Sequence, residues 1–200
     1  AVHNITDWRL DGDSIAVLNM PFDTNRSGQI GSYIRDYSTS ENNGMIYGDN
    51  IFSESGVVGG SYHFDEYTDY IEIADDSSLD MVDEITLGAW VKFDSLPSYP
   101  RVIAKQYSDL TTAGSCYQLG MRSSKARFAI GGVFDQYASG DDLQMGQWYY
   151  IVGTYDRQTA RLYLDGQEIW SDSYSGAIRT SDENLSIGMS LYAGTYNYGH

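Results

Sequence analysis

The sequence predicts an all-β protein in which two antiparallel sheets pack as a sandwich, and three features of the chain support this fold. Residues 148–155 (WYYIVGTY) read as a strand whose successive side chains point to opposite faces, with aromatic residues on both faces. Asp165-Gly166 then supplies the two residues that a type I′ hairpin turn needs. Finally, strand-like segments and turn signals recur at a spacing of about 8–12 residues, which is typical of sandwiches.

The predicted elements follow one another along most of the chain. A first strand is expected at residues 14–22, where Pro21 closes it, and residues 23–50 form a long loop without a helix pattern. One helical turn is expected around residues 77–79. The remaining strands are expected within residues 61–73, 84–93, 101–107, 116–121, 126–133, 134–139, 148–155, 161–164, 167–170 and 185–189.

The central strands determine the predicted core. Residues 148–155 carry aromatic side chains on both faces, so we expect both faces to be covered. In residues 85–93 the apolar positions Ile85, Leu87, Ala89 and Val91 share one face, and Trp90 lies on the other. The positions expected to be mostly buried are Trp90, Val91, Phe93, Trp148, Ile151, Leu162, Leu164 and Ile187.

The charge of the chain excludes several classes of partner. It has 28 acidic residues against 12 Lys and Arg, a net charge of −16. Such a chain repels nucleic-acid backbones and anionic lipid surfaces, so neither is an expected partner. It contains no apolar run long enough for membrane insertion. Cys116 is the only cysteine, which rules out a disulfide within the chain, and it is expected to be a buried, inert thiol.

The loop at residues 23–50 offers oxygen ligands for a calcium ion. Asp23, Asp36 and Asn43 are the predicted ligands, and other Asp, Asn and Ser residues lie among the glycines of the same loop. The alternative is a loop whose Asp, Asn and Ser side chains bond to its own backbone. A long irregular loop in a compact domain needs some source of order, and both accounts supply one.

No catalytic constellation is present in the sequence, so the chain is not expected to be an enzyme. It has no nucleophile elbow, phosphate-binding loop, dinucleotide fingerprint or zinc-protease motif. The nearest pair of acids for glycoside hydrolysis is Glu66 and Glu72, which share a strand face. In one straight strand they would lie about 20 Å apart, too far for the roughly 5–5.5 Å of a retaining glycosidase.

The ordered segments SYHFDEYTDYIEI, EITLGAWVKF, GQWYYIVGTYD, RLYLDGQEI and NLSIGM resemble the laminin-G-like, concanavalin A-like jelly-roll domains. The resemblance covers about residues 14–190, which makes residues 1–13 an N-terminal extension and residues 14–200 the domain. It implies two curved antiparallel sheets that bind a glycan or a protein at the rim or the concave face. Many members hold a structural or rim calcium ion, and a minority are glycosidases.

The function expected from the residues and the resemblance is a non-catalytic, extracellular binding or adhesion module for a glycan or a surface protein. Tyrosines at strand ends can stack on sugar rings, and Tyr107, Asp109 and Tyr137 are the predicted ligand-binding residues. Related domains end in a strand that pairs with the first one, and we expect this chain to lack it. The unpaired edge of residues 14–22 would then favour self-association, so the alternative function is a subunit of a surface assembly or filament held by strand exchange between copies. A glycosidase is the third alternative.

Overall fold

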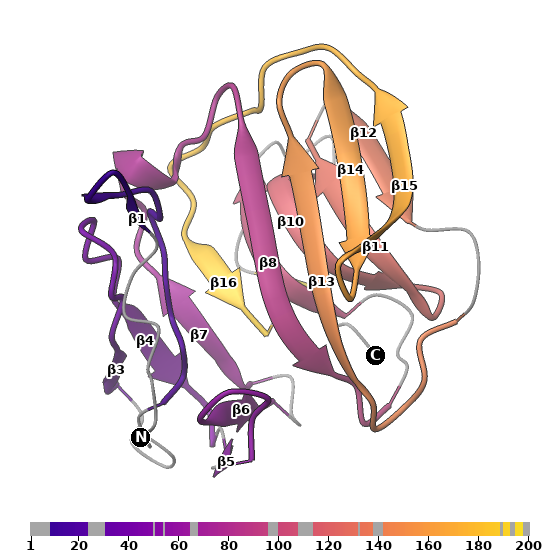
Figure 1. Ribbon diagram of the computed structural model, residues 1–200. Helices are drawn as coiled ribbons and strands as arrows, with labels where there is room; N and C mark the ends of the chain where they lie inside the picture. Colours follow the sequence, from indigo (N-terminus) through magenta and orange to yellow (C-terminus); the bar gives the residue numbers. More distant parts are fainter. Residues whose placement is uncertain are drawn as a thin grey trace. The chain divides into compact units, whose positions relative to one another are not determined.

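A computed structural model gives the fold of the chain (Figure 1), and two compact units are described separately below. The N-terminal unit is Ala1–Leu79 and the C-terminal unit is Asp80–His200. In the described residues, no helix is both long and apolar enough to cross a membrane. The structure describes residues 9–23, 31–49, 51–53, 55–64, 68–95, 100–107, 114–131, 133–137, 142–188, 190–192 and 195–197.

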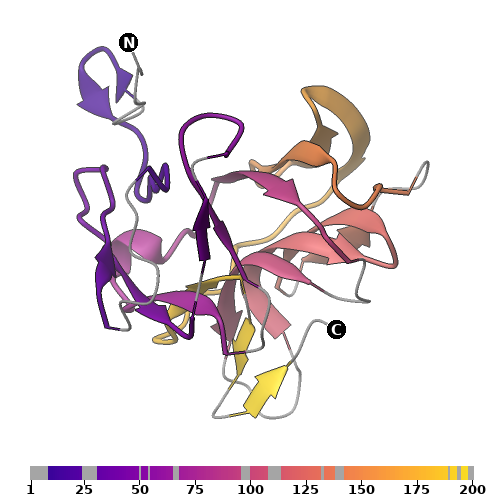
Figure 2. The same ribbon diagram turned by 90° about the horizontal axis from the view of Figure 1, so that it is seen from below.

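The N-terminal unit contains short antiparallel strands and one 3₁₀ turn. β3, β4 and β7 form one ladder, while β1 pairs with β2 and β5 pairs with β6. Figure 2 shows the β1–β2 hairpin standing apart from the β3–β4–β7 ladder. The 3₁₀ helix η1 confirms the predicted turn around residues 77–79. The elements are β1 (Arg9–Leu10), β2 (Asp13–Ser14), β3 (Tyr33–Ile34), β4 (Gly44–Tyr47), β5 (Ile51–Ser53), β6 (Ser61–His63), β7 (Tyr70–Ile73) and η1 (Ser77–Leu79).

The strand predicted at residues 14–22 is wrong, because beyond Ser14 this segment is irregular. Its backbone groups bond to the loop that follows β3 instead of to a neighbouring strand. The Asn19 N–H donates to the Asp36 carboxylate at 2.8 Å, and the Val17 carbonyl accepts from the Asn42 side-chain amide at 2.7 Å. These bonds satisfy groups that a strand edge would have exposed. The segment is therefore not an edge strand as predicted, and self-association through it stays a prediction.

The C-terminal unit contains two larger antiparallel sheets, each named here after one of its strands, and a separate pair of strands, β17 and β18. In the β13 sheet the strand order is β15–β14–β13–β8, and in the β9 sheet it is β12–β11–β10–β9–β16. The elements are β8 (Ile85–Lys92), β9 (Arg101–Tyr107), β10 (Gly114–Arg122), β11 (Lys125–Ile130), β12 (Phe134–Tyr137), β13 (Trp148–Tyr155), β14 (Thr159–Leu164), β15 (Gln167–Ser173), β16 (Leu185–Ile187), β17 (Ser190–Tyr192) and β18 (Thr195–Asn197).

The β13 sheet follows the register that its sequence predicts. The turn between β14 and β15 has φ of 51° at Asp165 and 82° at Gly166, so both central residues are left-handed as a type I′ turn requires. β13 pairs with β8 over eight positions, from Trp148 opposite Lys92 to Tyr155 opposite Ile85. Side chains at alternate positions therefore form rows that cross the sheet.

The two sheets of the C-terminal unit pack face to face, as Figure 1 shows with β13 in front of β10 and β11. Gly153 of β13 lies directly against the Phe128 ring of β11, and a side chain at this position would meet that ring. Phe134 of β12 contacts Tyr155 of β13 edge-on, with ring centroids 5.8 Å apart. Aromatic rings from one sheet thus pack against β13 of the other, which confirms the predicted sandwich.

The predicted core is confirmed in part. Val91, Ile151, Leu162 and Ile187 are buried, whereas Phe93, Trp148 and Leu164 are half-buried. The prediction is wrong for Trp90, whose side chain is 47% exposed. One face of the β8–β13 pair packs on the core and the other lies open, as is common for an antiparallel sheet.

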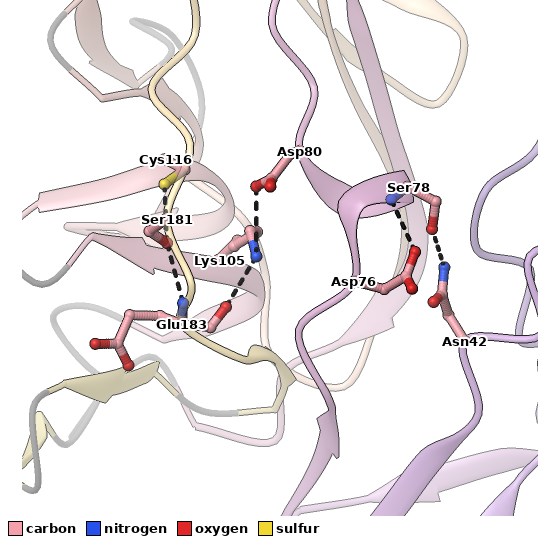
Figure 3. Close-up of polar contacts among 8 residues, drawn as sticks. All are labelled: Asn42, Asp76, Ser78, Asp80, Lys105, Cys116, Ser181 and Glu183. Carbon is pink, nitrogen blue, oxygen red and sulfur yellow. Dashed lines mark hydrogen bonds and ion pairs between the residues drawn. The ribbon is translucent and has the colours of Figure 1, made fainter.

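A buried polar cluster ties three segments of the C-terminal unit together (Figure 3). The Lys105 ammonium is fully buried, donates to the Glu183 carbonyl at 2.9 Å and lies 3.7 Å from an Asp80 carboxylate oxygen. The nearby Cys116 thiol lies 3.4 Å from the Ser181 hydroxyl, and burial raises the pKa of Cys116 above its ordinary value. A raised pKa disfavours the reactive thiolate, in agreement with a structural cysteine.

Candidate functional site

The exposed face of the β13 sheet carries a group of aromatic side chains, which we call the aromatic face: Trp90, Trp148, Tyr150 and Tyr163. The strand register places these residues near one another. Trp90 lies opposite Tyr150, and Trp148 lies opposite Lys92. Tyr163 of β14 lies opposite Val152, which is two positions along β13 from Tyr150. Along each of these strands, the more buried side chains occupy every second position. The four aromatic residues occupy the positions in between, so their side chains project away from the core.

Trp90 and Tyr150 form the centre of the aromatic face. Their ring centroids lie 5.2 Å apart with 33° between the ring planes, so the two rings make a slightly folded surface. Tyr150 is half-buried, and Trp90 is one of the large apolar side chains that the described part of the chain leaves exposed. Exposing an indole ring is unfavourable in water, so the group of aromatic side chains around Trp90 is a candidate binding surface.

Gly88 lies beside this pair and lets Tyr150 rest against the sheet. It occupies the same face of β8 as Trp90, two residues earlier, opposite Val152. A Cβ atom added at Gly88 would lie 3.0 Å from the Tyr150 hydroxyl oxygen and 3.5 Å from a Val152 methyl group. The Tyr150 side chain therefore leans over the space that the missing side chain leaves. Glycine within a strand often marks a close approach of this kind.

Charged groups surround the aromatic face. The Lys92 ammonium lies 5.5 Å from the Trp148 ring centroid, within the range of a cation–π contact. Arg161 lies between two acids, 3.4 Å from an Asp156 oxygen and 3.8 Å from a Glu168 oxygen. Such an arrangement presents flat apolar surfaces with hydrogen-bonding groups at their margins. This combination fits a sugar, whose ring has apolar faces and a polar edge.

The residues predicted to bind a ligand at the rim are not brought together by the register. Tyr107 ends β9 and pairs with Gly114 at the start of β10. Tyr137 ends β12 and pairs with Arg127, which in turn pairs with Gly120 further along β10. Asp109 lies outside the described residues, as does Glu66. A ligand site at Tyr107, Asp109 and Tyr137 stays a prediction.

The structure places two of the three predicted calcium ligands together. The Asp36 carboxylate is 2% exposed and accepts hydrogen bonds from the Asn19, Ser38 and Asn42 N–H groups and from the Ser38 hydroxyl, at 2.6–2.9 Å. The Asn43 side-chain oxygen accepts from the Asp36 N–H at 3.0 Å. The Asp36 and Asn43 side-chain oxygens therefore already accept hydrogen bonds. A carboxylate has about four acceptor positions, and the Asp36 carboxylate accepts four hydrogen bonds.

This arrangement matches the alternative to calcium, a loop ordered by its own hydrogen bonds. Bound calcium needs 6–8 oxygen ligands, whereas the groups around Asp36 are donors that point hydrogens at it. Asp23, the third predicted ligand, lies near Gly59. Within the described residues, no group of three or more His, Cys, Asp or Glu side chains is placed to hold a metal. Calcium binding stays a prediction, and these contacts do not favour it.

Sequence reasoning missed the aromatic face, although a signal for it is present. Thr86, Gly88, Trp90 and Lys92 alternate with the apolar residues of β8, and three of these four positions are small or polar. That pattern is typical of a solvent-exposed strand face. The prediction that Trp90 is buried rests on aromatic side chains lying on both faces of residues 148–155, but the structure leaves one of these faces open.

Comparisons with known proteins identify the fold of this chain. A family model described as the Concanavalin A-like lectin/glucanases superfamily matches residues 65–199. Domain 4 of AbnA, an extracellular GH43 arabinanase from Geobacillus stearothermophilus solved with arabinotriose, aligns with a TM-score of 0.54 and 14% identity, over 70% of this chain and 66% of that one. No curated protein sequence matches the chain.

A second similar structure is the sialidase of Trypanosoma rangeli in complex with 2,3-difluorosialic acid. It aligns with a TM-score of 0.58 and 16% identity, over 87% of this chain and 27% of that one. The chain thus spans just under two thirds of the arabinanase-domain chain and about a quarter of the sialidase chain. At these identities the likeness shows a shared fold.

Proposed function

Because the chain belongs to the Concanavalin A-like lectin/glucanases superfamily, we propose that it is a non-catalytic, extracellular module that binds a glycan through its aromatic face. The observation that carries the proposal is the exposed Trp90 ring, which packs against Tyr150 on the open side of the β13 sheet. A sugar ring stacked on Trp90 would cover the indole, and its hydroxyl groups would bond to the polar groups around it.

The rigidity of the platform supports this proposal. Trp90 and Tyr150 lie opposite each other within two paired eight-residue strands whose other face is buried in β13 and buried or half-buried in β8. Side chains held by such a scaffold lose little conformational entropy when a ligand binds. One of the similar structures, the arabinanase domain, was solved with arabinotriose, which makes this neutral trisaccharide a reasonable first probe.

The non-catalytic part of the proposal concerns the acids near the aromatic face. The Asp165 carboxylate accepts the Tyr150 N–H at 2.8 Å, and Glu168 accepts from the Ser171 hydroxyl at 2.6 Å and lies near Arg161. Both carboxylates thus have structural partners. Of the acids considered for catalysis from the sequence, Glu72 accepts from the Tyr47 hydroxyl at 3.1 Å. We therefore expect no hydrolysis of a sugar that the face binds.

The test is a titration of the whole chain with neutral oligosaccharides, beginning with arabinotriose and extending to a glycan array. Binding should quench or shift tryptophan fluorescence, since Trp90 would pass from water to a sugar surface. Replacing Trp90 with alanine should reduce affinity at least about tenfold, which corresponds to 1.4 kcal/mol. Its effect on the free energy of unfolding should be small because the side chain is half exposed.

Val82→Ala is the matched control, because Val82 is 46% exposed and lies in the same unit just before β8. It should bind as the unmodified chain does. Equal affinity for the Trp90→Ala variant and the unmodified chain would refute binding at the aromatic face. Release of reducing sugar during the titration would refute the non-catalytic assignment.

A further inference from the structure

The N-terminal unit contains a pocket that the aromatic face does not involve. Its volume is about 400 Å³, and it is a hollow open to solvent, because every lining residue except Asp36 is exposed. It is lined by Tyr33 of β3, Arg35 and Asp36 just after β3, and Glu41 and Asn43 just before β4. These are residues from the loop for which the sequence predicts calcium.

The floor of the pocket is fixed by Asp36. Its carboxylate accepts hydrogen bonds from four donor groups of three residues, and these bonds order the loop around it. The Asn43 oxygen accepts from the Asp36 N–H, which sets the orientation of the Asn43 amide. Because the oxygen takes that bond, the amide nitrogen is the donor that Asn43 presents to a ligand.

The walls of the pocket supply an aromatic ring and two opposite charges. The Arg35 guanidinium stacks on Tyr37, 4.8 Å from the ring centroid, which orients its N–H groups. Tyr33 is 59% exposed, and Glu41 is exposed at a position with φ of 54°. The pocket therefore offers donors from Arg35 and Asn43, an acceptor from Glu41 and an exposed ring from Tyr33.

The balance of charge limits the class of ligand. A carboxylate or phosphate would meet Glu41 and the net charge of −16, and an ammonium group would meet Arg35. Hydroxyl groups donate and accept at once, so neighbouring hydroxyls on one ring match a donor beside an acceptor. We propose that this pocket is a second saccharide site, which holds one or two neutral sugar rings with Tyr33 against an apolar ring face.

This second site consists only of residues of the N-terminal unit, so it can be tested independently of the aromatic face. The test uses the full chain, labelled with ¹⁵N, and nuclear magnetic resonance titrations with D-glucose, D-galactose, D-mannose, L-arabinose and arabinotriose. At least one sugar should shift the Asn43 side-chain amide signal in a saturable way. The same shift should persist in the Trp90→Ala chain, in which the aromatic face is disabled.

Two variants test which side chains of the pocket contribute to sugar binding. Tyr33→Ala removes the ring, and Arg35→Gln removes a charged donor; each should weaken binding at the pocket by about tenfold or more. Val58→Ala is the control for Tyr33→Ala, because Val58 is 57% exposed in the same unit, and it should bind normally. A thermal melt of each variant confirms that the chain is folded.

Three results would overturn the second site. The first is that no sugar moves the Asn43 signal while that signal is observed. The second is a sugar-induced shift that persists unchanged in both folded variants, since the ligand would then lie elsewhere. The third is that millimolar Ca²⁺ shifts the Asn43 and Asp36 signals and the sugars do not, which would identify a cation site. Binding abolished by Trp90→Ala alone would also reject the pocket while leaving the aromatic face in place.

Discussion

At the scale of single residues, Gly88 shows how a missing side chain shapes a surface. Glycine inside a strand weakens it, because the residue loses more backbone freedom on folding and has no side chain to pack. Here the empty position lets the Tyr150 side chain lean beside Trp90, since a Cβ atom would lie 3.0 Å from the tyrosine oxygen. Gly88 is therefore a residue that disfavours a strand but makes room for Tyr150 at the aromatic face.

Replacing Gly88 with threonine should separate stability from binding. Threonine favours strands, by up to about 1 kcal/mol over poor strand formers, so the free energy of unfolding should be unchanged or higher. Its side chain should displace the Tyr150 hydroxyl and weaken sugar binding severalfold. Urea unfolding and the arabinotriose titration measure the two effects.

The matched control for Gly88→Thr is Thr86→Val, two residues earlier on the same face of β8. It should leave binding unchanged. If Gly88→Thr binds sugar as well as the unmodified chain, the position of Tyr150 does not matter for the site.

At the scale of elements, the turn between β13 and β14 depends on one carboxylate. The Asp156 carboxylate accepts hydrogen bonds from the Gln158 and Thr159 N–H groups, at 3.0 and 2.6 Å. Arg157, which follows Asp156, has a left-handed backbone with φ of 62°. These N–H bonds, first that of Thr159 and then that of Gln158, lower the pKa of Asp156 below its ordinary value of 3.8. The side chain thus stabilises a turn that a left-handed arginine would otherwise strain.

This lowered pKa predicts how the turn responds to acid. A carboxyl group whose pKa is lower in the folded state stabilises the fold at pH values above its ordinary pKa, and this contribution is lost as pH falls through the lowered value. Asp156→Asn should therefore destabilise the chain at pH 7, and the difference from the unmodified chain should shrink as pH falls below 3.8. Urea midpoints at several pH values test this, and a difference that does not change with pH would contradict it.

At the scale of the whole molecule, the sandwich of the C-terminal unit depends on residues of the β13 sheet that face the β9 sheet. Leu162 of β14 and Ile151 of β13 are fully buried, and Gly153 allows the Phe128 ring to approach the sheet. Their alternation with exposed residues places an apolar layer between the sheets and the aromatic face on the opposite side. The core and the candidate site are therefore two sides of the same strands.

Truncating Leu162 to alanine should cost about 2–5 kcal/mol of unfolding free energy, because it opens a cavity in this layer. Leu164→Ala, at a half-buried position of the same strand, should cost less. Chemical denaturation of both variants measures the difference. A cost under about half a kcal/mol for Leu162→Ala would mean that β14 does not pack as described.

Local sequence patterns were enough to predict several features of the fold. Alternation identified β8 and β13, the Asp165-Gly166 pair identified a type I′ turn, and Leu162 was assigned correctly to the core. These predictions succeed because strand periodicity and turn conformation are set by residues that are neighbours in the chain.

Two features could be learned only from the three-dimensional fold: which side of a strand is covered, and which distant polar groups are hydrogen-bond partners. Aromatic residues on both faces of the central strands predicted that Trp90 is buried, but exposure depends on whether another layer covers that face. Residues 14–22 have the composition of a strand, yet their backbone bonds to Asp36 and Asn42, about 20 residues away. Such choices depend on contacts between residues far apart in the chain, which no local pattern records.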